Sequence, residues 1–265
     1  MTGAGLHVDG LLLDMDGVLT VSTDPVPGAV EAVARLHDAG LPMRILTNTT
    51  GYTQAAIGAG LRALGFPLAD DDVFTAPVAA VAYLKAEHPG ARVFVLGDAL
   101  HDDTRALHRV DVDERPDVIL VSGADESFTF DTLNRVYRAL RDGAALVAMH
   151  RNLTWMTREG ECLDAGAYLL GLERATHTEA VTTGKPAPAF FLAGLWSLGL
   201  SPEQVAMVGD DIDNDVLAAQ LCGVTGVLVR TGKFREEELA QAPVQPDHVI
   251  GSIVDLPDLL GLRKA

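Results

Sequence analysis

Short apolar runs alternate along the chain with longer segments in which apolar residues recur at helical spacing. A short, fully apolar run is typical of a strand buried on both faces, and a period of about 3.6 residues is typical of an amphipathic helix. Their alternation predicts a parallel α/β sheet. The apolar runs predict strands at residues 11–15, 42–46, 93–96, 118–121, 145–148, 205–208 and 224–229. The periodic segments predict helices at residues 28–39, 53–64, 77–87, 131–141, 187–198 and 213–221.

Two acidic residues follow the first predicted strand, in the segment Asp14-Met15-Asp16-Gly17. In open α/β sheets, ligand sites form at the carboxyl ends of the strands. Gly17 allows the backbone to turn sharply, so that Asp14 and Asp16 can reach one ligand from different directions. The alternative is an ordinary surface loop rich in Asp and Gly, which is a weaker explanation because an apolar strand comes directly before it.

The densest acidic cluster of the chain follows the strand predicted at 205–208. Its members are Asp210, Asp211, Asp213 and Asp215. Carboxylates this close repel one another unless a cation or solvent compensates them, and their hard oxygens suit Mg²⁺ or Ca²⁺. The spacing excludes an EF-hand, because Val216 and Cys222 would occupy its glycine and glutamate positions. A metal site at the sheet edge is favoured, although Asp213 and Asp215 also suit the start of a helix.

Two further segments suit a phosphate. Thr47-Asn48 ends the second predicted strand, and a hydroxyl with free backbone N–H groups at a helix start can bind a small anion. Ordinary N-capping explains the same residues equally well. Lys185 lies between Gly184 and Pro186, which restrict its backbone and could direct its ammonium at a phosphoryl group. A solvated lysine in a turn is the commoner case.

In this order, the four segments resemble the four motifs of the haloacid dehalogenase superfamily of aspartate-nucleophile phosphatases. Other stretches are similar to the class IIA nitrophenylphosphatase-like subgroup: Leu133-Asn134, Asp142-Gly143-Ala144, Gly166-Ala167-Tyr168, Leu172-Glu173 and Leu228-Val229-Arg230-Thr231-Gly232-Lys233-Phe234. The resemblance covers the chain from Leu11 to about Leu260. It implies a Rossmann-like parallel-sheet core, residues 1–77 and 180–265, with an inserted α/β cap domain of the C2 type, residues 78–179.

The resemblance also implies a reaction, the hydrolysis of small phosphorylated metabolites with Mg²⁺ through an aspartyl-phosphate. Asp14 would be the nucleophile, and Asp16 would act as general acid and then as general base. Thr47, Asn48 and Lys185 would bind the phosphate, and Lys185 would also neutralise the nucleophile. The metal would be bound by Asp14, the backbone carbonyl of Asp16 and Asp210. Asp211 and Asp215 would lie behind these ligands and orient them.

Three alternatives stay open from the sequence. One is a phosphotransferase or mutase, in which a sugar hydroxyl replaces water. Another is a non-catalytic phosphate-binding or regulatory module, but such a module has no use for both Asp14 and Asp16. The last is a receiver-type domain phosphorylated on Asp14, against which the inserted domain and the chain length argue.

Composition limits the partners. The chain of 265 residues has 20 Lys and Arg against 37 Asp and Glu, a formal net charge of −17. This charge argues against nucleic acid and against an anionic membrane as partners.

Two cysteines are too few for a disulfide framework, and no secretory signal or spanning apolar stretch is visible, so we expect a cytoplasmic protein. The resemblance further suggests a homodimer. Because a large share of the acidic excess of the predicted core lies at the predicted metal site, a phosphate should bind well only when Mg²⁺ and Lys185 reverse the local charge.

Overall fold

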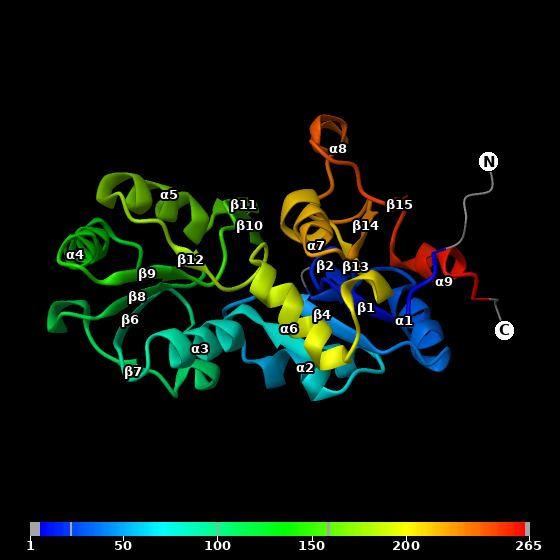
Figure 1. Cartoon of the computed structure of the whole chain (residues 1–265), viewed down its shortest axis with the longest axis horizontal. Coiled ribbons are helices and arrows are strands. Elements are labelled where there is room, and N and C mark those ends of the chain that lie inside the picture. Colours follow the sequence, from blue (N-terminus) through cyan, green and yellow to red (C-terminus); the bar gives the residue numbers. More distant parts are fainter. Residues whose placement is uncertain (1–5, 22, 100, 158–159, 263–265) are drawn as a thin grey trace. The chain divides into compact units, whose positions relative to one another are not determined.

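The computed structural model of the chain describes residues 6–21, 23–99, 101–157 and 160–262. It consists of two compact units, whose elements are labelled in Figure 1. Unit 1 comprises Met1–Thr47, Ala55–Phe74 and Pro188–Ala265, and unit 2 comprises Asn48–Gln54 and Thr75–Ala187.

Unit 1 is built on a six-stranded sheet in the order β15-β14-β13-β1-β4-β5. Its strands are β1 (Gly10–Leu13), β4 (Met43–Thr47), β5 (Val73–Thr75), β13 (Val205–Gly209), β14 (Thr225–Val229) and β15 (His248–Ile250). The strand β1 pairs in parallel with both β4 and β13, and β14 pairs in parallel with β13 and β15. The carboxyl ends of these strands therefore lie along one edge of the sheet.

Both faces of this sheet are covered, because successive residues of a strand point to opposite sides. Leu11 and Leu13 belong to the apolar core that includes α1 (Ala29–Asp38) and α2 (Gln54–Ala63). Leu12 lies against α6 (Pro188–Leu198), where a Cβ added to Gly194 would come within 2.9 Å of a Leu12 methyl carbon. This burial on both faces explains why β1 consists of apolar residues without alternation.

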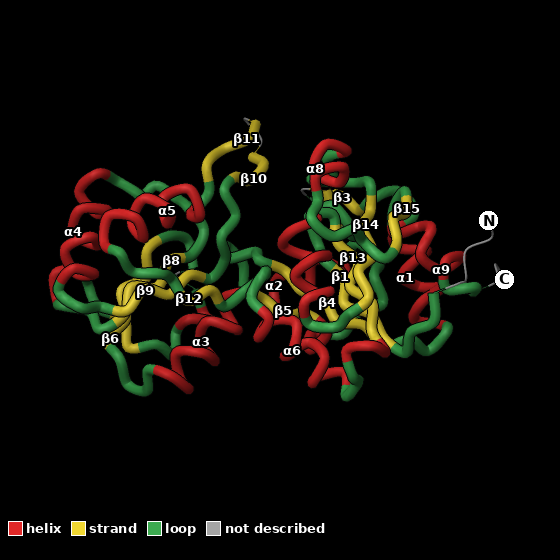
Figure 2. The backbone as a smooth tube through the Cα atoms, turned by 45° about the horizontal axis from the view of Figure 1, so that its top comes forward, coloured by secondary structure: helices red, strands yellow, loops and turns green. Residues whose placement is uncertain are grey.

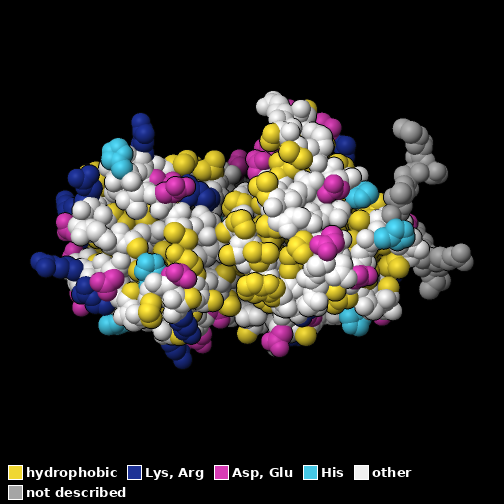
Figure 3. Space-filling view, in the orientation of Figure 1, with side chains coloured by type: hydrophobic (Ala, Val, Ile, Leu, Met, Phe, Trp, Pro, Cys, Tyr) yellow, Lys and Arg dark blue, Asp and Glu magenta, His cyan; other side chains and the backbone are white. Residues whose placement is uncertain are grey.

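The remaining elements of unit 1 are short. They are β2 (Thr20–Val21), β3 (Asp24–Pro25), the π-helix Ile212–Leu217, α7 (Ala218–Leu221), α8 (Glu236–Gln241), α9 (Leu256–Leu259) and the 3₁₀ turns Asp70–Asp72, Pro202–Gln204 and Ile253–Asp255. Apolar side chains gather over α6 and α7 on the face shown in Figure 3. Trp196 of α6 and Leu221 of α7 are mostly exposed. The helix α6 is therefore apolar on its outer side as well as toward the sheet.

Unit 2 has a parallel five-stranded sheet in the order β12-β9-β8-β6-β7. Its strands are β6 (Arg92–Leu96), β7 (His108–Arg109), β8 (Val118–Val121), β9 (Ala145–Ala148) and β12 (Val181–Thr182). One face packs against α3 (Ala76–Glu87), and the other packs against α4 (Phe130–Arg141) and α5 (Ala165–Thr176). An antiparallel hairpin of β10 (Thr154–Thr157) and β11 (Gly160–Leu163) extends away from this sheet in Figure 2. The 3₁₀ turns are Asp102–Thr104 and Val112–Glu114.

These two parallel, helix-covered sheets confirm the predicted α/β class with a Rossmann-like core and a second α/β domain. Residues 78–179 all lie in unit 2, which also includes Asn48–Gln54 and residues directly on either side of that range. Those after residue 179 include β12, which pairs with β9. The assignment of the units as catalytic core and cap, with the predicted boundaries, stays a prediction. No helix in the described ranges is long and apolar enough to cross a membrane.

Candidate active site

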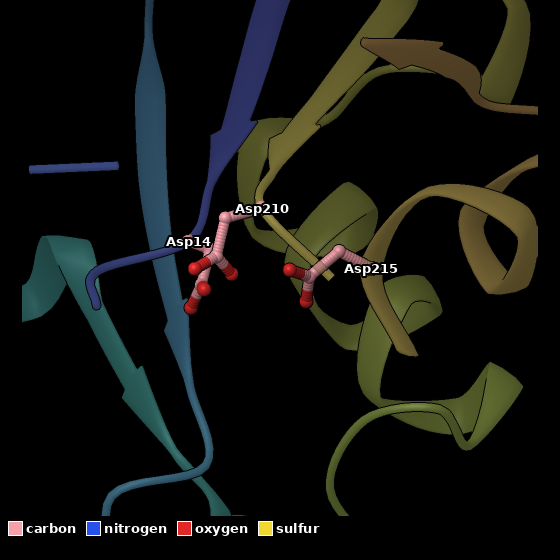
Figure 4. A group of neighbouring side chains, drawn as sticks. All are labelled: Asp14, Asp210 and Asp215. Carbon is pink, nitrogen blue, oxygen red and sulfur yellow. The ribbon is translucent and has the colours of Figure 1, made fainter. Parts of the chain in front are cut away.

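Three buried carboxylates meet at the carboxyl edge of the unit 1 sheet. Asp14 follows β1 and Asp210 follows β13, and these two strands are neighbours in register, with Leu13 opposite Val208. Asp215 faces them from the π-helix (Figure 4). One carboxylate oxygen of each residue lies within 4.8 Å of the other two, and no more than 7% of any of the three residues is exposed. We call Asp14, Asp210 and Asp215 the carboxylate triad.

The π-helix Ile212–Leu217 brings Asp215 into the triad. Asp211 caps it, accepting hydrogen bonds from the backbone N–H of Asn214 at 2.9 Å and from its Nδ2 at 2.8 Å. The backbone N–H of Val216 donates at 3.4 Å to the Asp211 carbonyl five residues earlier, which is the π-type bond. The sequence pattern predicted an α-helix over residues 213–221, and the structure instead has this wider turn followed by α7.

Asp215 is held against the end of β13. Its Oδ2 accepts the backbone N–H of Asp211 at 3.2 Å. A Cβ on Gly209 would overlap the Asp215 side chain, so that only glycine allows this close approach. Local backbone geometry therefore directs the Asp215 carboxylate toward Asp14 and Asp210. The supporting role behind the metal ligands, which the family resemblance implies for Asp215, stays a prediction.

A glycine-containing loop after β14 holds Asp210. The backbone N–H of Lys233 donates to Asp210 Oδ2 at 2.7 Å. Gly17 and Gly232 flank the same oxygen with φ of 83° and 63°, and a Cβ on either residue would overlap it. The hydroxyl of Thr231 donates to the carbonyl of Gly17, which ties the two loops together. We call Thr231-Gly232-Lys233 the clamp loop.

The charges in this group are unbalanced. Burial, together with the carboxylates of Asp14 and Asp215, raises the pKa of Asp210 to about 8. Lys233 lies at the rim, half exposed, with its Nζ 3.6 Å from Asp211 Oδ2. Burial lowers the pKa of its ammonium, but the neighbouring carboxylates, Asp211 first, outweigh that effect and raise the pKa above its ordinary value.

The triad suits a divalent cation that prefers oxygen ligands. Asp210 Oδ1 is buried and accepts no hydrogen bond from the described residues, while Oδ2 accepts the N–H of Lys233 from the clamp loop. A buried carboxylate oxygen in this state carries a large desolvation cost, which a cation among three carboxylates would offset. Hard oxygen donors of this kind fit Mg²⁺.

The other predicted residues fall into two sets. In unit 1, Thr47 is buried at the end of β4, and the Asp16 side chain is exposed and not part of the triad. In unit 2, the Asn48 amide donates to the Lys185 carbonyl and accepts the Lys185 N–H, both at 2.9 Å. The structure thus joins Asn48 to Lys185, which are far apart in the sequence. Lys185 itself is buried, at 3% exposure.

The role of the clamp loop was not predicted from the sequence. In the sequence these residues contribute only to the family resemblance. The signal that was available is its position, because the loop follows a strand whose carboxyl end lies at the same sheet edge as Asp14 and Asp210.

Comparison with known proteins identifies the family of the chain. Residues 11–113 match the family described as haloacid dehalogenase-like hydrolase, and residues 182–256 match the HAD-hydrolase-like family. The human phospholysine phosphohistidine inorganic pyrophosphate phosphatase is 34% identical over 260 residues, which cover 96% of this chain and 94% of that protein.

Two solved structures are similar over most of the chain. The p-nitrophenyl phosphatase from Archaeoglobus fulgidus has a TM-score of 0.87 and 30% identity, covering 96% of this chain and 99% of its own. A glycerol phosphate phosphatase from Mycobacterium tuberculosis, solved in complex with magnesium, has a TM-score of 0.83 and 28% identity, covering 94% of this chain and 77% of its own. The chain belongs to the haloacid dehalogenase-like hydrolases, within their class IIA nitrophenylphosphatase-like subgroup.

Proposed function

We propose that this enzyme hydrolyses small phosphorylated metabolites with Mg²⁺, through an aspartyl-phosphate formed on Asp14. The chain is a phosphoric monoester hydrolase, because it belongs to a hydrolase family in which its similar members are phosphatases. The finer proposal is supported above all by the carboxylate triad, in which Asp210 Oδ1 is buried and, within the described part of the chain, accepts no hydrogen bond.

The metal would be held by Asp14, Asp210 and the backbone carbonyl of Asp16. Asp211 and Asp215 would orient these ligands, since Asp215 already lies within the triad and Asp211 caps the π-helix that carries it. Bound there, Mg²⁺ would supply positive charge that keeps Asp14 ionised and balances the phosphoryl oxygens. The magnesium bound in a similar phosphatase structure supports this choice of ion.

The reaction would proceed in two displacements at phosphorus. The Asp14 carboxylate attacks phosphorus, the bond to the leaving oxygen breaks, and Asp16 gives that oxygen a proton. Asp16 then takes a proton from a water molecule that attacks the aspartyl-phosphate, which releases inorganic phosphate and regenerates Asp14. The exposure of the Asp16 side chain, in contrast to buried Asp14, suits a group that exchanges protons with both substrate and water.

Thr47, Asn48 and Lys185 would bind the phosphoryl group. The two hydrogen bonds between Asn48 and Lys185 fix the backbone that carries the lysine ammonium. Preorganised donors and charges of this kind stabilise the transition state without a reorganisation cost during the reaction. The same bonds leave Asn48 oriented by its partner, so that removing its amide should also disturb Lys185.

The substrate would be a small phosphorylated metabolite. The net charge of −17 disfavours nucleic acid as a partner, and a cytoplasmic location and a homodimer stay predictions of the sequence. A screen of sugar phosphates, nucleoside monophosphates, pyridoxal phosphate and pyrophosphate would narrow the substrate class.

The direct test is hydrolysis of 4-nitrophenyl phosphate with Mg²⁺ and with a chelator. We expect turnover only with the metal, and a loss on the order of 10³-fold or more in Asp14→Asn, which removes the nucleophile. Asp213→Asn is the matched control, because Asp213 is an exposed member of the same acidic segment and not part of the triad. Full activity of Asp14→Asn, or of the chelated enzyme, would contradict the proposal.

The intermediate has its own test. Rapid acid quenching with radiolabelled substrate should leave label on the wild-type protein, and hydroxylamine should release it, because acyl phosphates react with that nucleophile. Asp14→Asn should show no label. Active enzyme that never carries label would indicate direct attack by water.

A further inference from the structure

Lys233 brings two different groups to the acidic site of unit 1. Its backbone N–H binds Asp210 Oδ2 at 2.7 Å, and its side-chain ammonium lies 3.6 Å from Asp211 Oδ2. The proposed reaction uses neither group. About half of the side-chain surface is exposed, and the ammonium contacts Asp211, which is not a member of the carboxylate triad.

The position of Lys233 is fixed on both sides along the chain. On the preceding side, the Thr231 hydroxyl is bonded to the Gly17 carbonyl. On the following side, the Arg235 guanidinium donates to the carbonyls of Lys233 at 3.0 Å and Phe234 at 2.9 Å. The backbone of the clamp loop is thus held independently of the lysine ammonium, which means that the charge can be removed without removing the loop.

Several carboxylates surround the single ammonium of Lys233. Asp14, Asp210 and Asp215 lie together, and Asp211 lies next to Lys233. Mutual repulsion among buried carboxylates is costly, and a positive charge nearby offsets part of it. A divalent cation bound in the triad would perform the same compensation more completely, and it would be repelled by the ammonium.

We propose that Lys233 is a built-in counter-cation of the carboxylate triad, which balances part of its charge in the metal-free protein and opposes the binding of the divalent metal. The inference rests on the proposed function only for the choice of Mg²⁺ as that metal. Lys233 is here a positioning and charge-balancing residue. As a consequence, the site binds the metal less tightly than the carboxylates alone would, and the folded protein is stable without the ion.

The test variant is Lys233→Met, which keeps the backbone N–H and a side chain of similar length while removing the charge. Without metal, this variant should unfold at a lower temperature than the wild type. It should bind Mg²⁺ more tightly, by roughly three- to tenfold for a unit charge near a partly solvated site. At saturating Mg²⁺ the difference in unfolding temperature should shrink, because the ion then supplies the compensation.

Two controls separate charge from structure. Lys233→Arg retains the charge and should restore both the metal-free unfolding temperature and the wild-type Mg²⁺ affinity. Arg62→Met removes one positive charge from the exposed last turn of α2 in unit 1 and should leave Mg²⁺ affinity unchanged. Calorimetric titration with MgCl₂ and thermal unfolding give these values without any substrate.

The outcomes are distinct from those of the phosphatase assay. Equal or weaker Mg²⁺ binding by Lys233→Met would overturn the counter-cation role, even if the enzyme hydrolyses phosphate esters as proposed. An unchanged metal-free unfolding temperature would also overturn it. If the wild type binds no Mg²⁺, the metal part of the proposed function is wrong, and the metal-free unfolding temperature still tests Lys233.

Discussion

Asp210 in unit 1 and Glu173 in unit 2 are both carboxylates withdrawn from water, but they have opposite surroundings. Glu173 accepts two hydrogen bonds from the Arg151 guanidinium, at 2.9 and 2.6 Å, and a third from the Ala180 N–H at 2.8 Å. Burial opposes its ionisation, but Arg151 and the Ala180 N–H lower the pKa of Glu173 below its usual value. Asp210 faces two further carboxylates, and its pKa is raised to about 8.

The difference separates two uses of buried charge. A carboxylate whose pKa is lowered by folding stabilises the native state, whereas one whose pKa is raised destabilises it when ionised. Unit 2 pairs its carboxylate within the fold. Unit 1 retains an unfavourable electrostatic interaction at a sheet edge, which is expected where a site must bind a cation.

The largest effect should come from Asp210→Asn, which removes the unfavourable charge. Mg²⁺-dependent turnover should fall on the order of 10²–10³-fold, because the charge that holds the metal is lost. The metal-free variant should nevertheless unfold at a higher temperature than the wild type above pH 8, because repulsion within the triad is relieved. Thermal unfolding with a chelator checks the second part, and a lower unfolding temperature there would contradict the comparison.

A smaller effect should follow from closing the space beside Asp210. In Gly232→Ala the new Cβ would overlap Asp210 Oδ2, so Mg²⁺ affinity should fall roughly 10–100-fold as the ligand is displaced. Gly199→Ala is the matched control, since Gly199 has a similar φ of 69° and, apart from its neighbours along the chain, no atom of the described residues lies within 4 Å of an added Cβ. Equal metal affinities in the two variants would contradict the role of this close approach to Asp210.

The raised pKa of Asp210 predicts a pH dependence. Below pH 8 a proton occupies the carboxylate and Mg²⁺ must displace it, so affinity should rise with pH between 6 and 8, by at most about tenfold per unit. Over the same range the metal-free protein should lose stability as pH rises, because the folded state binds more protons than the unfolded chain between about pH 4 and 8. Calorimetry in two buffers of different ionisation enthalpy counts the released protons; a constant affinity would show that Asp210 is already ionised.

The smallest effect, opposite in sign to the stability change in Asp210→Asn, is expected from Glu173→Gln in unit 2. Loss of this charge leaves the Arg151 guanidinium without its partner, and the free energy of unfolding should fall by about 1–2 kcal/mol. Mg²⁺ affinity and turnover per folded molecule should not change. Denaturant unfolding measures the free energy of unfolding. A Glu173→Gln variant more stable than the wild type would contradict the view that the unit 2 carboxylate stabilises the fold while the unit 1 carboxylate destabilises it.

The strands were predictable where the physics is local. Residues 118–121 and 145–148 were predicted with the observed bounds of β8 and β9, because each is an apolar run buried on both faces of a parallel sheet. The strand β12 has only two residues and no periodicity, and it exists because β9 offers a free edge for pairing. The π-helix also depends on contacts that a hydrophobic pattern does not show. Asp215 lies against Gly209, and its carboxylate accepts the backbone N–H of Asp211.

Part of the candidate site was also predictable from the sequence. Asp14 and Asp210 follow apolar strands, and the sheet-edge rule alone brings such residues together. The clamp loop was not found, because the reason for its glycine is the close approach of Gly232 to Gly17 and Asp210, which are distant in the sequence. A single sequence shows a glycine there, but it does not show which atom would meet a Cβ.

The strand order of unit 1 also has a consequence for how the chain is made. The strand β1 lies between β4, which ends at Thr47, and β13, which begins at Val205, and all of unit 2 is synthesised between them. At roughly 5–20 residues per second, a ribosome takes on the order of ten seconds or more to deliver β13 after β4. During that interval, unit 2 can complete its own sheet while β1 has one neighbour and an open apolar edge. Nascent chains that stop before Val205 are therefore candidates for chaperone binding or aggregation.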